Sequence, residues 1–227
     1  MFSLDIFKSK YDVETHDLMI LGRKFYYFLP SSIEPFIDIN SPMNNFPLWA
    51  KVWPSSMVLA DFMAAQPVDP KKRIIEIGAG IGIAGIVASA FGHNMTITEY
   101  NADAMEFAGA NACINGCSGI PIISMNWNEP QLTCRYDKII GSEVVFRERD
   151  FIPIQKLFQS VLKPDGEIIL VSEIRKPVLE FYQKMKDLYE LKVRQKVLRA
   201  ENEEIKIIFC CMKPKPIISQ ITQQQEV

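Results

Sequence analysis

A glycine-rich segment, Glu76-Ile-Gly-Ala-Gly-Ile-Gly-Ile-Ala-Gly85, constrains the fold of this chain more than any other feature. It follows a short apolar run at 73–77 and precedes a run of small, mostly apolar residues at 83–91. This order predicts a strand, a tight turn at 78–82 and a helix. Glycines at a strand-to-helix turn let the backbone approach a ligand closely. The turn is therefore the first candidate for a binding site.

The pattern of strand and helix then repeats along the chain. Further strands are predicted at 95–99, 120–124, 138–141 and 167–171, and helices at 102–115, 151–162 and 178–189. The segments 191–198 and 205–212 are typical of an antiparallel hairpin. Strands that alternate with helices pair in parallel and carry helices on both faces. The sequence therefore predicts an α/β fold with a doubly wound, mostly parallel, seven-stranded sheet and a C-terminal antiparallel hairpin.

The two ends of the chain depart from this pattern. Residues 17–29 predict two short strands around a turn at Gly22, which gives a small β-hairpin in an N-terminal extension, 1–45. A helix is predicted to begin near Pro54. The main domain is expected at 46–212, and the segment 213–227, with its prolines and glutamines, is expected to form a loose tail.

Composition excludes several classes of protein. The chain has 25 Lys and Arg against 27 Asp and Glu, so its net charge gives no general reason to bind nucleic acid or an anionic membrane. Two histidines do not favour a His-rich metal site or a Ser-His-Asp hydrolase, and no metal site is expected. An odd number of cysteines, two of them adjacent, does not fit a disulfide framework. With no apolar run long enough to span a membrane, the sequence predicts a soluble, cytoplasmic protein.

The glycine turn alone fits two cofactors. Residues 80–85 match Gly-x-Gly-x-x-Gly. Glu99 follows about 20 residues after the turn, the position at which an acidic side chain hydrogen-bonds ribose hydroxyls in dinucleotide sites. That spacing suits NAD and S-adenosylmethionine (SAM) equally. Glu76 favours SAM, because a carboxylate at the turn repels an anionic pyrophosphate and attracts the ammonium and sulfonium of SAM.

The motifs together resemble class I SAM-dependent methyltransferases, which have a Rossmann-like fold, over roughly residues 46–212. The segment Glu76–Gly82 is similar to the Asp/Glu-x-Gly-x-Gly-x-Gly signature of that family, and Leu162–Glu167 is similar to its Leu-Lys-Pro-x-Gly turn. Pro47–Pro54, Asn126-Trp127 and Ser142–Phe146 resemble the seven-β-strand lysine methyltransferase group. The Trp-Ala-Lys-Val-Trp-Pro form is most similar to the branch that modifies the β subunit of electron transfer flavoprotein. The chain departs from the group's Asp-Val-x-Tyr motif, with Glu143 for Asp and Phe146 for Tyr.

The resemblance implies a role for each motif residue. For SAM binding, it implies that Glu76 receives the methionine ammonium, directly or through water; a helix-dipole contact is the alternative for Glu76. It implies that three glycines admit the methionine part and that Glu99 takes both ribose hydroxyls. Trp53 would close over the cofactor, and Ser142 would lie beside the sulfonium. The implied cofactor-binding residues are Trp53, Glu76, Gly78, Gly80, Gly82, Glu99, Tyr100, Asn126, Trp127 and Ser142. Tyr100, Asn126 and Trp127 would contact adenine, and ordinary packing is the alternative for each. Glu143 is the candidate catalytic residue, which would orient the acceptor amine; the alternative is that it holds a loop or the cofactor.

The expected activity is transfer of a methyl group from SAM to a lysine amine in a protein substrate. A small-molecule methyltransferase, a SAM-binding partner protein without catalysis and an NAD-dependent oxidoreductase stay open as alternatives. Residues 175–199 carry a net charge of +5, so the rest of the chain carries −7. Lys192, Arg194 and Lys196 alternate, so they share one face of the predicted strand. This face is either a solvated edge or a docking surface for an acidic protein. The oligomeric state is not indicated.

Overall fold

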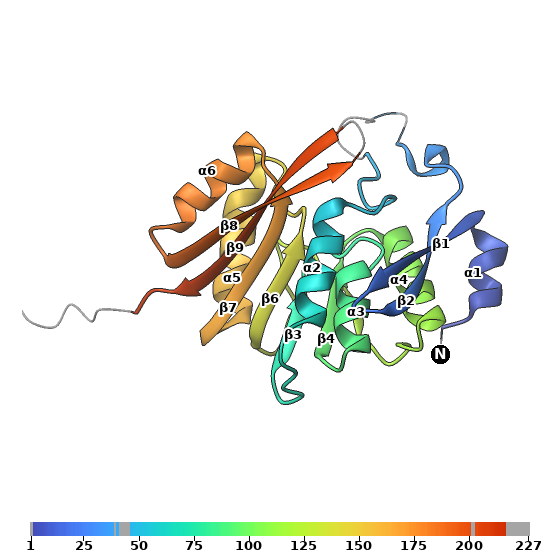
Figure 1. Ribbon diagram of the computed structural model, residues 1–227, viewed down its shortest axis with the longest axis horizontal. Coiled ribbons are helices and arrows are strands. Elements are labelled where there is room, and N and C mark those ends of the chain that lie inside the picture. Colours follow the sequence, from blue (N-terminus) through green and yellow to red (C-terminus); the bar gives the residue numbers. More distant parts are fainter. Residues whose placement is uncertain (1, 39, 41–45, 201–202, 217–227) are drawn as a thin grey trace, which may run out of the picture.

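The computed structural model describes residues 2–38, 40, 46–200 and 203–216 of the 227-residue chain. Its centre is a seven-stranded sheet in the order β5-β4-β3-β6-β7-β9-β8 (Figure 1). The strands are β3 (Arg73–Glu76), β4 (Asn94–Glu99), β5 (Ile122–Ser124), β6 (Tyr136–Ser142), β7 (Leu162–Glu173), β8 (Tyr189–Ala200) and β9 (Glu203–Pro214). β9 is antiparallel to β7 and β8, and the remaining neighbours are parallel. The predicted fold class is confirmed.

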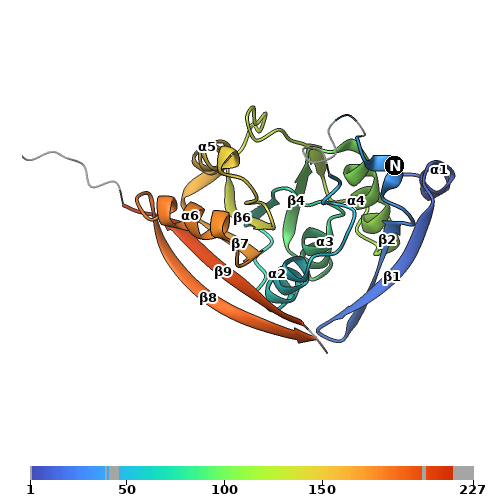
Figure 2. The same ribbon diagram turned by 90° about the horizontal axis from the view of Figure 1, so that it is seen from above.

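Helices cover both faces of this sheet. They are α2 (Pro54–Ala64), α3 (Ile83–Ala90), α4 (Ala102–Ile114), α5 (Phe151–Val161) and α6 (Lys176–Met185), with short 3-10 turns at Glu34–Phe36 and Glu148–Asp150. Figure 2 shows α5 and α6 on one side of the sheet and α2 and α3 on the other. Neighbouring residues of a strand point to opposite faces of the sheet. Ile74 belongs to the hydrophobic core with α2, α3 and α4, whereas Ile75 belongs to the core with α5 and α6. This period of two explains why the strands are apolar almost throughout.

The N-terminal part packs against the same core. The predicted hairpin is β1 (Val13–Ile20) with β2 (Arg23–Pro30), joined by Leu21 and Gly22 at φ 47° and 79°. Two positive φ angles define the tight turn that joins antiparallel strands without splaying them. An unpredicted helix, α1 (Leu4–Lys10), precedes the hairpin and buries Phe7 in the core shared by α2, α3 and α4. The boundary at 45/46 between extension and domain stays a prediction.

A buried asparagine joins the hairpin to the glycine turn. Asn111 of α4 accepts a hydrogen bond at Oδ1 from the Phe28 amide, 2.7 Å away, and donates from Nδ2 to the Ile81 carbonyl at 3.1 Å. The side chain is completely buried. One amide group thus satisfies backbone atoms of β2 and of the turn that precedes α3, which removes the cost of burying them unpaired.

The C-terminal hairpin is longer than predicted. β9 runs to Pro214, so Lys213 and Pro214 belong to the sheet instead of the expected tail, of which 217–227 lies outside the described residues. Glu173, the last residue of β7, pairs with Ile207, which pairs with Lys196. The hairpin therefore continues past the carboxyl end of β7. No helix among the described residues is long and apolar enough to cross a membrane.

The predicted basic face lies on β8, the edge strand. Lys192, Arg194 and Lys196 pair in register with Cys211, Phe209 and Ile207, so they project to one face. All three are exposed, and no ion pair is found for them within the described part of the chain. Docking of an acidic protein on this face stays a prediction.

Substitution of Phe7 tests whether α1 is part of the core. Phe7→Ala should lower the free energy of unfolding by about 3–5 kcal/mol, because a fully buried ring is lost and a cavity remains. Ile6→Ala, its neighbour at 69% exposure, should change the free energy by no more than about 0.5 kcal/mol. Urea unfolding of both variants measures the difference. Equal stability of the two variants would show that α1 does not contribute to the core.

Candidate functional site

The glycine turn has the geometry that the sequence predicts. Gly78, Gly80 and Gly82 have φ angles of 57°, 56° and 84°, and Gly82 is the N-cap of α3. Residues other than glycine rarely adopt these backbone angles, so the turn favours glycine at each position. The Ala79 amide donates to the Thr98 carbonyl at 3.1 Å, which ties the turn to the end of β4.

Glu76 lies beneath this turn with its carboxylate directed at α3. The side chain is 1% exposed, and its Oε2 accepts a hydrogen bond from the Gly85 amide at 2.7 Å. Burial raises the pKa of Glu76 to about 8; the Gly85 hydrogen bond opposes this rise and the charge of Glu99 adds to it. A side chain at Gly85 would collide with the carboxylate, which explains a glycine within the helix. Glu76 therefore caps the first turn of α3 in this structure.

Glu99 connects the glycine turn to the start of α4. Its Oε2 accepts from the Gly80 amide at 2.8 Å, and its Oε1 accepts from the amides of Tyr100 and Asn101 at 2.7 and 3.0 Å. A carboxylate has about four acceptor positions, so about one remains for a ligand hydroxyl. The Tyr100 ring does not share this arrangement, because it is 69% exposed.

Two tryptophans lie against the glycine turn. A Cβ added at Gly78 would be 3.0 Å from Trp127 and 3.2 Å from Val144, and one added at Gly80 would be 3.5 Å from the Cα of Trp49. The glycines at these positions therefore admit the neighbouring side chains close to the backbone of the turn. The Oδ1 of Asn126 accepts a hydrogen bond from the Asn128 amide at 2.9 Å, so this atom is engaged in a local turn.

A second cluster of side chains gathers where β6 ends. Glu143 has a φ of 51°, is 6% exposed, and accepts at Oε1 from the Glu173 amide at 2.7 Å. Its Oε2 forms an ion pair with Arg175. The guanidinium of Arg175 lies 4.8 Å from the centre of the Phe146 ring and 6.0 Å from that of Trp53. The Phe146 and Trp53 rings are 5.9 Å apart.

Sequence reasoning missed Arg175 as a site residue. Its position two residues past the end of β7 is a signal for it, because ligands bind outside the carboxyl ends of parallel strands. The structure gathers the two clusters at that edge. Val144 joins them, since it contacts the position of Gly78 and is the neighbour of Glu143. Ser142 is the last residue of β6 and lies half-buried beside Glu143.

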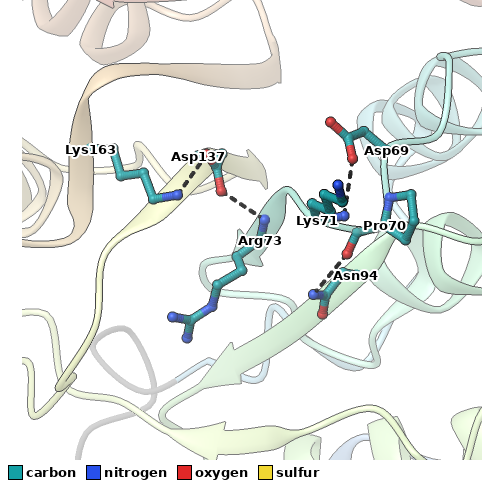
Figure 3. A network of polar contacts seen from close by, with 7 residues as sticks. All are labelled: Asp69, Pro70, Lys71, Arg73, Asn94, Asp137 and Lys163. Atoms are coloured by element: carbon teal, nitrogen blue, oxygen red, sulfur yellow. Dashed lines mark hydrogen bonds and ion pairs between the residues drawn. The ribbon is translucent and has the colours of Figure 1, made fainter.

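The opposite end of the strands is stabilised by polar contacts. Lys163 Nζ lies 2.8 Å from Asp137 Oδ1, and Asp137 Oδ2 accepts from the Arg73 amide at 2.8 Å (Figure 3). A cavity of about 360 Å³ opens beside this network, and its lining includes Asp137 and Lys138. Lys138 is itself paired with Glu167 at 2.8 Å. The charges there compensate one another, which indicates a structural role.

The residues present fit SAM in their chemistry. The turn supplies close backbone approach, Glu99 supplies an acceptor for ribose hydroxyls, and Trp127 supplies an indole for stacking. Glu76 does not fit direct contact with an ammonium in this structure, since its carboxylate is buried and bonded to Gly85. Within residues 2–38, 40, 46–200 and 203–216, no group of three or more His, Cys, Asp or Glu is placed to hold a metal ion.

The raised pKa of Glu76 predicts a pH-dependent stability. The carboxyl is protonated in the folded chain up to about pH 8 but ionises near 4.5 when unfolding exposes it. The unfolded chain therefore binds fewer protons between these values. The contribution of Glu76 to the free energy of unfolding is complete below pH 4.5 and falls by about 1 kcal/mol per pH unit up to pH 8.

Glu76→Gln, which is neutral throughout and keeps an acceptor for Gly85, should remove this dependence. Its stability relative to the native chain should rise from about pH 5 to about pH 8 in urea unfolding. Glu190→Gln, an exposed position on β8, is the matched control and should follow the native chain. Parallel curves for Glu76→Gln and the native chain would contradict the raised pKa.

Comparisons with known proteins agree with this geometry. A family model described as "Lysine methyltransferase" matches residues 34–188. Protein N-lysine methyltransferase METTL21A of Danio rerio is 35% identical over 136 residues, which are 56% of this chain and 61% of that protein. EEF1A lysine methyltransferase 3 of Mus musculus is 30% identical over 130 residues, 56% of each chain. The chain thus spans less than two thirds of either relative.

A solved structure shows the same fold. The SAM-dependent methyltransferase from Agrobacterium tumefaciens has a TM-score of 0.63 and 17% identity, over 89% of this chain and 71% of that chain. At this identity the likeness concerns the fold alone. The match of the family model over more than half of the sequence decides the membership. The chain belongs to the lysine methyltransferase family of class I SAM-dependent methyltransferases.

Proposed function

We propose that this chain transfers a methyl group from SAM to the side-chain amine of a lysine in a protein substrate. The observation that carries the proposal is the cluster of Glu143, Phe146 and Trp53 at the carboxyl edge of the sheet, next to the glycine turn. A carboxylate and two aromatic rings attract an ammonium group and its methylated forms. An acceptor lysine would therefore find a cation-binding surface beside the place where the cofactor binds.

The cofactor-binding roles follow from the contacts at the turn. Glu99 would accept a ribose hydroxyl, Trp127 would lie against adenine, and Gly78, Gly80 and Gly82 would let the methionine part approach the backbone. Glu76 would act on SAM through the turn that it holds in place. Tyr100 and Asn126 would lie at the margin of the adenine site, and Ser142 beside the sulfonium. Trp53, at the N-cap of α2, would cover the cofactor.

SAM supplies a methyl group that is already activated, so the chain's own residues mainly position the amine and exclude water. Lysine has an ordinary pKa near 10.4, and its amine must lose a proton before it attacks. Glu143 would orient the amine with the acceptor capacity that Glu173 and Arg175 leave open. Phe146 and Trp53 would hold the methylene chain, and solvent would take the proton.

The identity of the substrate is a narrower proposal. The mouse relative is named for EEF1A, which makes EEF1A one substrate to test. The segment Trp49–Pro54 supports a second one, the β subunit of electron transfer flavoprotein, through its similarity to the enzymes that modify it. A small-molecule acceptor and a SAM-binding partner role without catalysis remain the alternatives.

Labelling of a cell lysate tests the proposed function. The purified chain, given SAM with a tritiated methyl group, should label lysine in one or a few proteins of a methyl-poor lysate. Glu99→Gln should weaken SAM binding in calorimetry by about tenfold or more, because hydrogen bonds to a charged group contribute about 1.5–3 kcal/mol. Glu190→Gln should bind as the native chain does. Label confined to small molecules, or absent while SAM binds, would contradict the lysine proposal.

Glu143→Gln tests the candidate catalytic residue in the same assay. The variant should keep the SAM affinity of the native chain, since Glu143 contacts Arg175 and Glu173 and not the glycine turn. Labelling of protein should slow by about tenfold to a hundredfold, as expected when a carboxylate that orients the amine is neutralised. An unchanged labelling rate would show that Glu143 only holds the end of β7 and Arg175.

A further inference from the structure

Lys51 carries an amine that contacts an aromatic ring of the candidate site. Its Nζ is 3.7 Å from the centre of the Trp53 ring, well within the range of a cation–π contact. The side chain is exposed, and no carboxylate pairs with it among the residues that the structure describes. The Trp53 ring is itself held, because its Nε1 donates to the Leu48 carbonyl at 2.9 Å.

The backbone around Lys51 spans the two clusters of the site. Trp49, two residues earlier, lies against Gly80 in the glycine turn, and Trp53, two residues later, contacts Phe146 beyond the end of β6. Consecutive Cα atoms are about 3.8 Å apart, so Lys51 Cα is within about 8 Å of Trp49 Cα. Lys51 therefore lies on the short segment that joins a residue packed on the glycine turn to a residue packed on Phe146.

We propose that Lys51 is a methyl acceptor within the chain itself, an inference that rests on the proposed function. The neutral amine of Lys51 forms a nitrogen–carbon bond with the methyl group of SAM. The sulfur–carbon bond breaks with its electron pair left on sulfur, and the amine proton passes to solvent, to which Lys51 is open. Arg175, the other cation at these rings, is excluded as the acceptor because Glu143 holds its guanidinium, which does not lose its proton.

The product would remain where the structure places the amine. A methylated ammonium keeps its charge and gains apolar surface, and aromatic rings bind such groups well. Methylation of Lys51 would therefore strengthen its contact with Trp53 and compete with a substrate lysine for the same rings.

Mass spectrometry of the purified chain after incubation with labelled SAM tests this inference. Label is expected on Lys51 and should disappear in Lys51→Arg, which keeps the cation but not the amine. The labelled fraction at a given time should not change over about tenfold dilution, as an intramolecular step requires. Lys24 is the control, since its Nζ also lies over a ring, 5.3 Å from the centre of Tyr26, whose backbone amide donates to Asn115 at the end of α4 opposite to Glu99; Lys24 should stay unlabelled.

A second measurement needs no turnover. Reductive methylation with ¹³C-formaldehyde places methyl groups on every lysine, and Lys51→Arg identifies the signal of Lys51. That signal should be shifted upfield by the Trp53 ring and should move when S-adenosylhomocysteine is added. The signal of Lys24 should not respond to S-adenosylhomocysteine.

The outcomes separate this inference from the proposed function. Absence of label on Lys51, or a Lys51 signal that ignores S-adenosylhomocysteine, overturns the inference. If lysate proteins are labelled under the same conditions, the proposed function stands and Lys51 is only a cation–π contact at the surface. If nothing is labelled although SAM binds, both fall.

Discussion

The buried carboxyl group of Glu76 is the constraint on which the rest of the site depends. It occupies the space between β3 and the first turn of α3, where only glycine fits at position 85. Burial favours its protonated form, and its bond to the Gly85 amide satisfies a helix-end donor that would otherwise be buried unpaired. Glu99 fastens the opposite side of the turn at Gly80. The two acids therefore hold a backbone that glycine alone would leave flexible.

The N-terminal hairpin contributes to the same rigidity from a distance. Asn111 bonds both β2 and the carbonyl of Ile81, so the hairpin, α4 and the glycine turn share one hydrogen-bonded group. The Phe7 ring packs on both Phe28 and Phe107, in the core that also contains Ile81. Displacement of the hairpin would thus disturb the turn without touching any residue that faces a ligand.

The sequence predicted what depends on local pattern and left open what depends on partners far along the chain. Alternating apolar runs and the glycine spacing gave the sheet, its helices and the turn, since these follow from periodicity and backbone freedom. Helix α1 was missed because seven residues carry too little periodic signal. The ion pair of Glu143 with Arg175 joins residues 32 apart in sequence, and the bond of Glu76 to Gly85 depends on how α3 sits on β3. Such contacts are decided by packing, which no local pattern encodes.

The long edge strand β8 shows how this sheet avoids joining another. A twelve-residue strand with one unpaired side presents a row of free backbone groups to any passing strand. Val193 and Val197, 51% and 40% exposed, add apolar surface to that edge, which favours association with another strand. Lys192, Arg194 and Lys196 on the other face set like charges opposite one another whenever two copies meet edge to edge. The cations for which an acidic partner is predicted thus also oppose edge-to-edge association of two copies.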